Sequence, residues 1–480
     1  MLLVAFSLAL VWAIRVDLTP YLRGPAPYPE WRWLYLAKPT LDRAGPTLLF
    51  GLGILGLMAL TGKRRQRNGR TAALLVIVSI PAGVGFQLSL LDLELRGTTA
   101  TLVERSADPS FTSHMSVAAS REARDVTSFL TNYEELQLHW ARSAPHSATH
   151  PPGAVLLYRA GIELCARSPA IGRALFDRIL AAGVDPRGFH PPLSPPAVAA
   201  ALLVPLLLTL LSAAAAAPIA LAAWRLHGEP SAAARTGMLW LLLPGPALML
   251  PELDQAIAFP VAVALAALIV GAGTENRAGG WIAGISAGVA AAFALHLSYG
   301  AAAFLAVASF AAFAAAFDRT DPGQSLRGMR RAAAGALAVA ALLFLLPALW
   351  GTSPIGAART ALSIHRAGFT APRGYALWLL FNPVDFLLFL GPPVALAALF
   401  RAGTPPPTAA EGRFRRAFAI AAIALLASGV VRGEVGRIAI PLMPAALLAL
   451  LPRPRVWGAM LVGGLLILLD GVLRLSWQLP

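Results

Sequence analysis

The chain has 480 residues, of which 57% are hydrophobic and only 13% are charged. A soluble globular domain does not carry so large an apolar share, and many separate apolar runs reach the roughly 20 residues needed to cross a bilayer. The composition therefore excludes a soluble protein. It predicts an all-α, polytopic transmembrane helical bundle that forms a single integral membrane domain over residues 1–480.

The formal net charge is +15, and nearly all of the basic residues are arginine. Most of them lie in short turns between apolar runs, where basic residues orient helices in the membrane. The charge therefore does not predict a nucleic-acid partner; the expected surroundings are the lipid bilayer. The single cysteine, Cys165, cannot form a disulfide within the chain.

The amino-terminal third sets the expected orientation. Apolar runs over 2–14, 46–62 and 71–91 predict three spans, and 15–45 is a polar, aromatic loop between the first two. The densest basic cluster, residues 63–70, follows the second run and is expected on the cytoplasmic side. The third span then delivers residues 92–196 to the outer side.

Residues 92–196 are expected to form a large extracytoplasmic loop with interfacial helices. Its segment 108–153 is the one long polar passage of the chain and is rich in acids and histidines. Long loops without function are uncommon, which favours a candidate active site here. The apolar and charged residues of 116–140 predict a helix along the membrane surface, and 154–166 is too short and too charged to span.

From residue 197 onward the chain is predicted to be almost entirely helical. Arginine-rich turns alternate with turns that hold acids and histidines, which gives about 13 spans with the amino terminus inside and the carboxyl terminus outside. The predicted spans are 197–224, 236–250, 256–272, 280–296, 299–317, 332–350, 376–400, 417–431, 438–451 and 456–473. This pattern predicts a bacterial-type plasma membrane protein.

The same topology puts several polar clusters on the outer side with segment 108–153. The clusters are Glu252 and Asp254; His296 and Tyr299; His365, Arg366 and Arg373; and Arg432, Glu434 and Arg437. Acids near helix ends in lipid are rare and usually functional. We therefore expect these groups to converge at one membrane face.

Three features resemble polytopic glycosyltransferases of the GT-C fold, the relatives of protein O-mannosyltransferases and the aminoarabinose transferase. They are Asp108 in DPSFTS, the loop end His150-Pro151-Pro152-Gly153, and the late turn GEVGRIAIPLMP with its arginine, Arg437. The chain departs from the pattern in one respect. Many relatives carry adjacent Asp-Glu in the first outer loop, whereas here the acidic loop follows the third predicted span, so Glu134 or Glu135 could replace Asp108.

The resemblance implies transfer of a sugar from a polyprenyl-phosphate-linked donor to an acceptor, which the sequence does not identify, on the outer side. A carboxylate can take the acceptor proton, and arginine can hold the leaving phosphate. The expected catalytic residues are Asp108, with Glu135 as the alternative base, and His150. The expected substrate-binding residues are Glu134, Asp254, His296, Glu434 and Arg437.

Structural roles compete with several of these assignments. Asp108 could cap a helix, His296 could be a buried polar group, and Arg437 could pair with Glu434. The loop histidines lack the spacing of a zinc site, so no cofactor is expected and a divalent metal is not supported. The main alternative function is a polytopic transporter or lipid-carrier flippase.

Overall fold

The computed structural model of the chain describes residues 1–25, 29–38, 41–62, 68–109, 111–189, 191–318, 320–399 and 408–479. These residues are almost entirely helical, which confirms the expected class. Two strands of two residues each, β1 (Leu34–Tyr35) and β2 (Trp477–Gln478), pair in antiparallel fashion. This pair joins the loop between the first two predicted spans to the carboxyl-terminal end of the chain.

In the described part of the chain, seven helices are long and apolar enough to cross a membrane, and a bent helix pair would make an eighth. The pair, α20 (Tyr375–Leu390) and α21 (Pro392–Leu399), is bent by 101°. The seven are α2 (Ala44–Leu60) with η2 (Leu41–Arg43), α3 (Gly69–Leu91), α11 (Pro195–Ala214) with α12 (Ala216–His227), α15 (Leu253–Ala272), α16 (Arg277–Leu297), α18 (Pro322–Leu345) with η5 (Leu346–Trp350), and α25 (Val456–Ser476).

The other five predicted spans are short, broken or charged. Helices α1 (Leu2–Arg15) and α17 (Ala301–Ala316) are shorter than a span, and predicted span 236–250 divides into α13 (Pro230–Trp240) and α14 (Pro244–Leu248). Predicted span 438–451 divides into η7 (Ile440–Leu442) and α24 (Met443–Leu450), after the short α23 (Val435–Ile438). Helix α22 (Ala409–Ala427) carries four charged residues in its first half. Proline explains the breaks at 244 and 441, since it removes a backbone donor.

The helix ends follow local sequence rules. The side chains of Asn68, Asn276, Asp321 and Thr408 accept backbone N–H groups at the starts of α3, α16, α18 and α22. Such caps satisfy donors that have no partner inside the helix. The start of each of these four helices is therefore marked by one capping residue.

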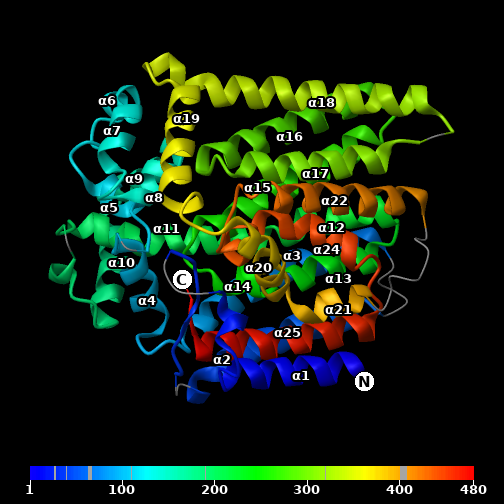
Figure 1. Ribbon diagram of the computed structural model, residues 1–480, viewed down its shortest axis with the longest axis horizontal. Coiled ribbons are helices and arrows are strands. Elements are labelled where there is room, and N and C mark those ends of the chain that lie inside the picture. The colour runs from blue at the N-terminus through cyan, green and yellow to red at the C-terminus, as the bar shows by residue number, and fades with distance from the viewer. Residues whose placement is uncertain are drawn as a thin grey trace.

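The long helices lie side by side, and a smaller helical layer covers one end of them (Figure 1). The layer contains α4 (Gly97–Ala107), α5 (His114–Ala119), α6 (Val126–Thr131), α7 (Tyr133–Trp140), α8 (Pro145–Thr149), α9 (Pro152–Arg167), α10 (Pro169–Ala181) and η4 (Pro186–Gly188). Also near this end are η1 (Pro20–Arg23), α19 (Pro354–His365) and the π-helical turn η6 (Arg366–Thr370).

Within this layer, the prediction of a single helix over 116–140 is wrong. Three short helices, α5, α6 and α7, lie there instead. Asp125 caps α6 with its side chain, and Asn132 separates α6 from α7. The short charged helix expected over 154–166 is present as α9.

The arginine-rich turns gather at the opposite end of the bundle. Arg235 donates to Thr61, and Arg413 donates to the carbonyl oxygens of Ala314 and Ala315 at the end of α17. Glu411 lies 3.2 Å from His227. Residues 63–67 of the basic cluster, Arg319 and Arg401 lie outside the described residues. The predicted inner turns are therefore neighbours in space, and the amino and carboxyl termini lie at opposite ends (Figure 1).

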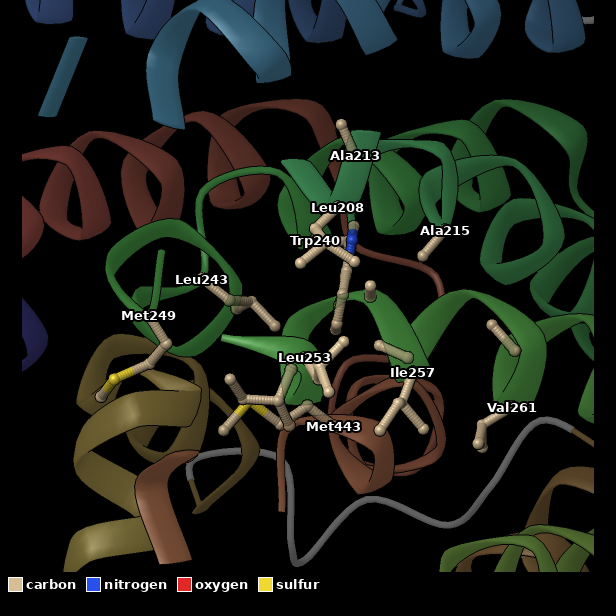
Figure 2. Packing of buried hydrophobic residues seen from close by; sticks show 14 of the residues in the cluster. Leu208, Ala213, Ala215, Trp240, Leu243, Met249, Leu253, Ile257, Val261 and Met443 are labelled. Atoms are coloured by element: carbon tan, nitrogen blue, oxygen red, sulfur yellow. The ribbon is translucent and has the colours of Figure 1, made fainter. Parts of the chain in front are cut away.

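A buried apolar core supports the end of the bundle that carries the helical layer. Trp240 is fully buried, and its Nε1 donates to the Ser212 carbonyl oxygen at 2.7 Å. Figure 2 shows Trp240 between Leu208 and Leu253, with Met443 close to Leu253. Leu253 lies between Glu252 and Asp254 in the chain. The packing of Leu253 in this core therefore helps to fix the positions of both acidic residues.

Candidate active site

A cavity of about 170 Å³ opens between the bundle and the helical layer. Its walls come from segments far apart in the sequence. The polar lining residues are Thr112, His114, His146, Thr149, His150, Glu252, Asp254, Ser298, Tyr299, His365, Thr370, Arg373, Arg432, Glu434 and Arg437. The structure thus brings together members of every outer cluster that the sequence singled out.

Arg437 is the centre of the charged part of the cavity. Its Nη1 lies 2.9 Å from Glu252 Oε2, and its Nη2 lies 2.8 Å from Glu434 Oε2. Asp254 Oδ2 is farther, 3.9 Å from Nη1. Two carboxylates are therefore hydrogen-bonded to the guanidinium, whereas Asp254 is held only by a longer electrostatic contact.

Burial and neighbouring opposite charges shift the pKa values of these groups in opposite directions. Burial alone would raise the pKa of Glu434, but Arg437 and Arg373 outweigh it and hold that pKa below its usual value. Burial is also the largest influence on Glu252 and raises its pKa in spite of Arg437. Burial alone would lower the pKa of Arg437, yet Glu252, Glu434 and Asp254 raise it. The arginine is thus firmly protonated.

The second wall of the cavity is a group of histidines from α5 and α8. The His114 and His150 rings lie 5.0 Å apart, and Ser147 Oγ lies 3.2 Å from His114 Nδ1. The Nδ1 of His150 lies 3.0 Å from the Leu297 carbonyl oxygen. Because a carbonyl oxygen only accepts, Nδ1 of His150 carries a proton, and a neutral His150 ring therefore has an acceptor at Nε2.

Burial keeps these histidines neutral at pH 7. It lowers the pKa of both His146 and His150 to about 4, and Arg437 adds to the effect in each case. Burial also lowers the pKa of His114 well below its usual value, with help from His150 and His146. Neutral imidazoles can both donate and accept, so this wall can hydrogen-bond hydroxyl groups without repelling a cation.

A third wall is made by two arginines that hold loops together. Arg432 Nη1 donates to the carbonyl oxygens of Thr370 at 3.2 Å and Arg373 at 2.7 Å. Arg373 in turn donates to the carbonyl oxygen of Arg432, and its Nη2 lies 3.4 Å from Glu434 Oε1. The cavity thus has three guanidinium groups and three carboxylates on one side of the histidines.

The predicted catalytic acids lie outside this cavity. Asp108 is exposed at the carboxyl-terminal end of α4, and Glu135 is exposed in the first turn of α7. Neither residue lines the cavity. The structure therefore brings His150, Asp254, Glu434 and Arg437 together but does not bring Asp108 or Glu135 to them.

Two predicted substrate-binding residues make contacts between helices. Glu134 accepts a hydrogen bond from Thr360 Oγ1 at 3.1 Å, which links α7 to α19. His296 Nε2 lies 3.0 Å from the Leu343 carbonyl oxygen, which links α16 to α18. Neither lines the cavity.

Six charged or histidine side chains of the cavity were not among the predicted site residues: Glu252, His114, His146, His365, Arg373 and Arg432. The signal for Glu252, Arg373 and Arg432 was present, since each lies in an outer cluster of the sequence. His114 is 3% exposed, and no apolar periodicity around it predicts its burial.

In the described part of the chain no three His, Cys, Asp or Glu side chains are grouped so as to hold a metal ion.

A second buried charge cluster lies beside the cavity and joins the helical layer to the bundle. Glu94 pairs with Lys38, Arg105 and Arg474 at 2.9, 3.2 and 3.0 Å. Arg105 also donates to the Leu250 carbonyl oxygen at 3.4 Å, two residues before Glu252. The cluster thereby fixes α4 against the segment that carries two of the cavity carboxylates.

In comparisons with known proteins, no family model, no curated protein and no solved structure matches the chain.

Proposed function

We propose that this protein is a membrane glycosyltransferase that moves a sugar from a polyprenyl-phosphate-linked donor to an acceptor on the outer side of a bacterial-type plasma membrane. The observation that supports the proposal is the cavity in which Asp254, the histidines and three arginines meet. It opens at the end of apolar helices, where a lipid-linked donor would present its phosphate and sugar. The proposal includes the 13-span topology, with this end outside.

Within the proposal, Asp254 replaces Asp108 as the general base. Asp254 lines the cavity, and its Oδ2 is 3.9 Å from Arg437 Nη1, beyond hydrogen-bond range. Glu252 and Glu434 are instead occupied by close contacts to the same guanidinium. A carboxylate without such a close pair is better placed to accept a proton from an acceptor hydroxyl.

The proposed step is a single displacement at the anomeric carbon of the sugar. The acceptor oxygen forms a bond to that carbon, and its proton passes to the Asp254 carboxylate. The bond between the anomeric carbon and the phosphate oxygen breaks, and its electron pair stays on the phosphate. Neutral His114 and His150 would hydrogen-bond sugar hydroxyl groups.

The leaving polyprenyl phosphate gains negative charge, which preorganised arginines stabilise. Arg373, Arg432 and Arg437 line the cavity. Arg437 Nε is buried and has no hydrogen-bond partner among the described residues. The three arginines thus supply the positive charge that the reaction needs.

The experiment uses purified full-length protein reconstituted in vesicles with a polyprenyl-phosphate donor that carries a radiolabelled sugar. A transferase releases free polyprenyl phosphate in step with the appearance of label on an acceptor. A flippase moves the intact donor between leaflets and releases no polyprenyl phosphate. Release of the carrier phosphate supports the proposal, and movement of the donor without release rejects it.

A further inference from the structure

The turn that presents Glu434 to the cavity has an unusual backbone. Gly429 has φ +63°, Gly433 has φ +93° and Glu434 has φ +57°. Glycine adopts such values readily, whereas the left-handed region is sterically strained for a residue that has a Cβ atom. A glutamate therefore keeps this conformation only where surrounding contacts hold it.

Two side chains of α20 make these contacts. Asn382 Nδ2 donates to the Val431 carbonyl oxygen at 2.8 Å, and the Gly433 N–H donates to Asn382 Oδ1 at 3.2 Å. Asp385 Oδ2 accepts the Gly436 N–H at 2.7 Å. Three backbone groups on both sides of Glu434 are thus bound by side chains that lie one helical turn apart.

We propose that Asn382 and Asp385 are positioning residues that hold residues 431–436 so that Glu434 and Arg437 face the cavity. Neither side chain lines the cavity, so both act through the turn. Asn382 is 2% exposed, and its amide has one donor bond and one acceptor bond to the same turn. The catalytic meaning of the inference rests on the proposed function, whereas the fixing of the turn does not.

The second oxygen of Asp385 connects the turn to the first outer loop. Trp33 Nε1 donates to Asp385 Oδ1 at 3.1 Å, and Trp33 is 3% exposed. One carboxylate thereby joins the loop between α1 and α2, helix α20 and the turn before α23. The amino-terminal loop consequently supports the geometry of the cavity although it supplies no lining residue.

Hydrogen exchange tests the positioning directly. In purified full-length protein, Asn382→Ala should speed amide exchange in 429–437 at least tenfold and leave α15 and α16 unchanged. Leu380→Ala is the matched control, because Leu380 lies on the same helix and is 70% exposed. Unchanged exchange at 429–437 in Asn382→Ala, or an equal increase in Leu380→Ala, would overturn the inference.

Turnover provides the second measurement. Asp385→Ala should lower kcat by roughly 100-fold, the effect of a misplaced catalytic group. Asp385→Asn should recover part of this loss, because its amide oxygen can still accept the Gly436 N–H. Equal kcat for folded wild type, Asp385→Asn and Asp385→Ala would overturn the positioning role. If wild-type protein transfers no sugar, the proposed function fails, and the exchange experiment still decides whether the turn is held.

Discussion

Arg437 and Glu252 are 185 residues apart in the sequence, yet Arg437 Nη1 lies 2.9 Å from Glu252 Oε2. The contact joins α23 to the start of α15, and both side chains are largely buried. Because the same guanidinium also contacts Glu434, removing it leaves two carboxylates without their shared cation. This contact therefore links the stability of the end that carries the helical layer to the chemistry proposed for it.

The first prediction concerns that cation. Arg437→Ala should destabilise the protein by about 3–5 kcal/mol, since it removes the cation that pairs with the buried Glu252 carboxylate. Thermal unfolding in detergent measures the effect. Arg96→Ala removes an exposed partner of Glu104 and should cost less than about 1 kcal/mol. Equal melting temperatures for the two variants would show that the Arg437 cluster is not a buried ion-pair network.

The second prediction concerns pH. The folded-state pKa values of His146 and His150, about 4, lie below the ordinary value of 6.5. The unfolded chain therefore binds protons first as the pH falls, and stability is lost between about pH 6.5 and 4. His150→Gln should flatten this loss in melting temperature. The same substitution at His139, which is exposed, should leave the slope unchanged. A wild-type slope in His150→Gln would contradict the neutral, buried state of this histidine.

The third prediction concerns the packing that places His150. A Cβ atom built on Gly153 would lie 2.1 Å from the His296 carbonyl oxygen, so α9 and α16 cannot approach with alanine there. Gly153→Ala should destabilise the protein by about 1–3 kcal/mol. Gly56→Ala is the control, because nothing lies within 4 Å of its added carbon. A melting temperature of Gly153→Ala at or above that of the control would reject this close contact.

The sequence predicted which residue clusters meet in the cavity better than it predicted the place of Asp108. The outer turns LPELDQ and VVRGEVGR could be identified because acids and arginines stand out between apolar runs, and the structure brings Glu252, Asp254 and Arg437 together. The place of Asp108 could not be predicted in the same way. It depends on where α4 ends and how α4–α10 pack, and short helices with many small residues encode that packing weakly. The positive φ of Glu434 likewise arises from Asn382 and Asp385, which are distant in sequence.

The fourth prediction concerns sidedness. Ser143 and Thr320 are exposed, and the predicted topology puts them on opposite sides of the membrane. In a Cys165→Ser background, Ser143→Cys should react with an impermeant thiol reagent from outside and Thr320→Cys only after permeabilisation. Because Cys165 is the single native cysteine, each variant then carries only the introduced thiol. Reaction of both cysteines in intact cells would contradict the topology on which the outer site depends.

We propose above that sugar transfer takes place in the cavity with Asp254 as the base. The most direct measurement is the single-turnover rate of transfer from a polyprenyl-phosphate donor by purified Asp254→Asn, Asp108→Asn and Glu135→Gln, each compared with wild type. We expect a loss of roughly 100-fold or more for Asp254→Asn, the size expected for a general base. Asp108→Asn and Glu135→Gln, both outside the cavity, should transfer at the wild-type rate. A wild-type rate for Asp254→Asn together with an inactive Asp108→Asn would show that Asp108, and not Asp254, is the base.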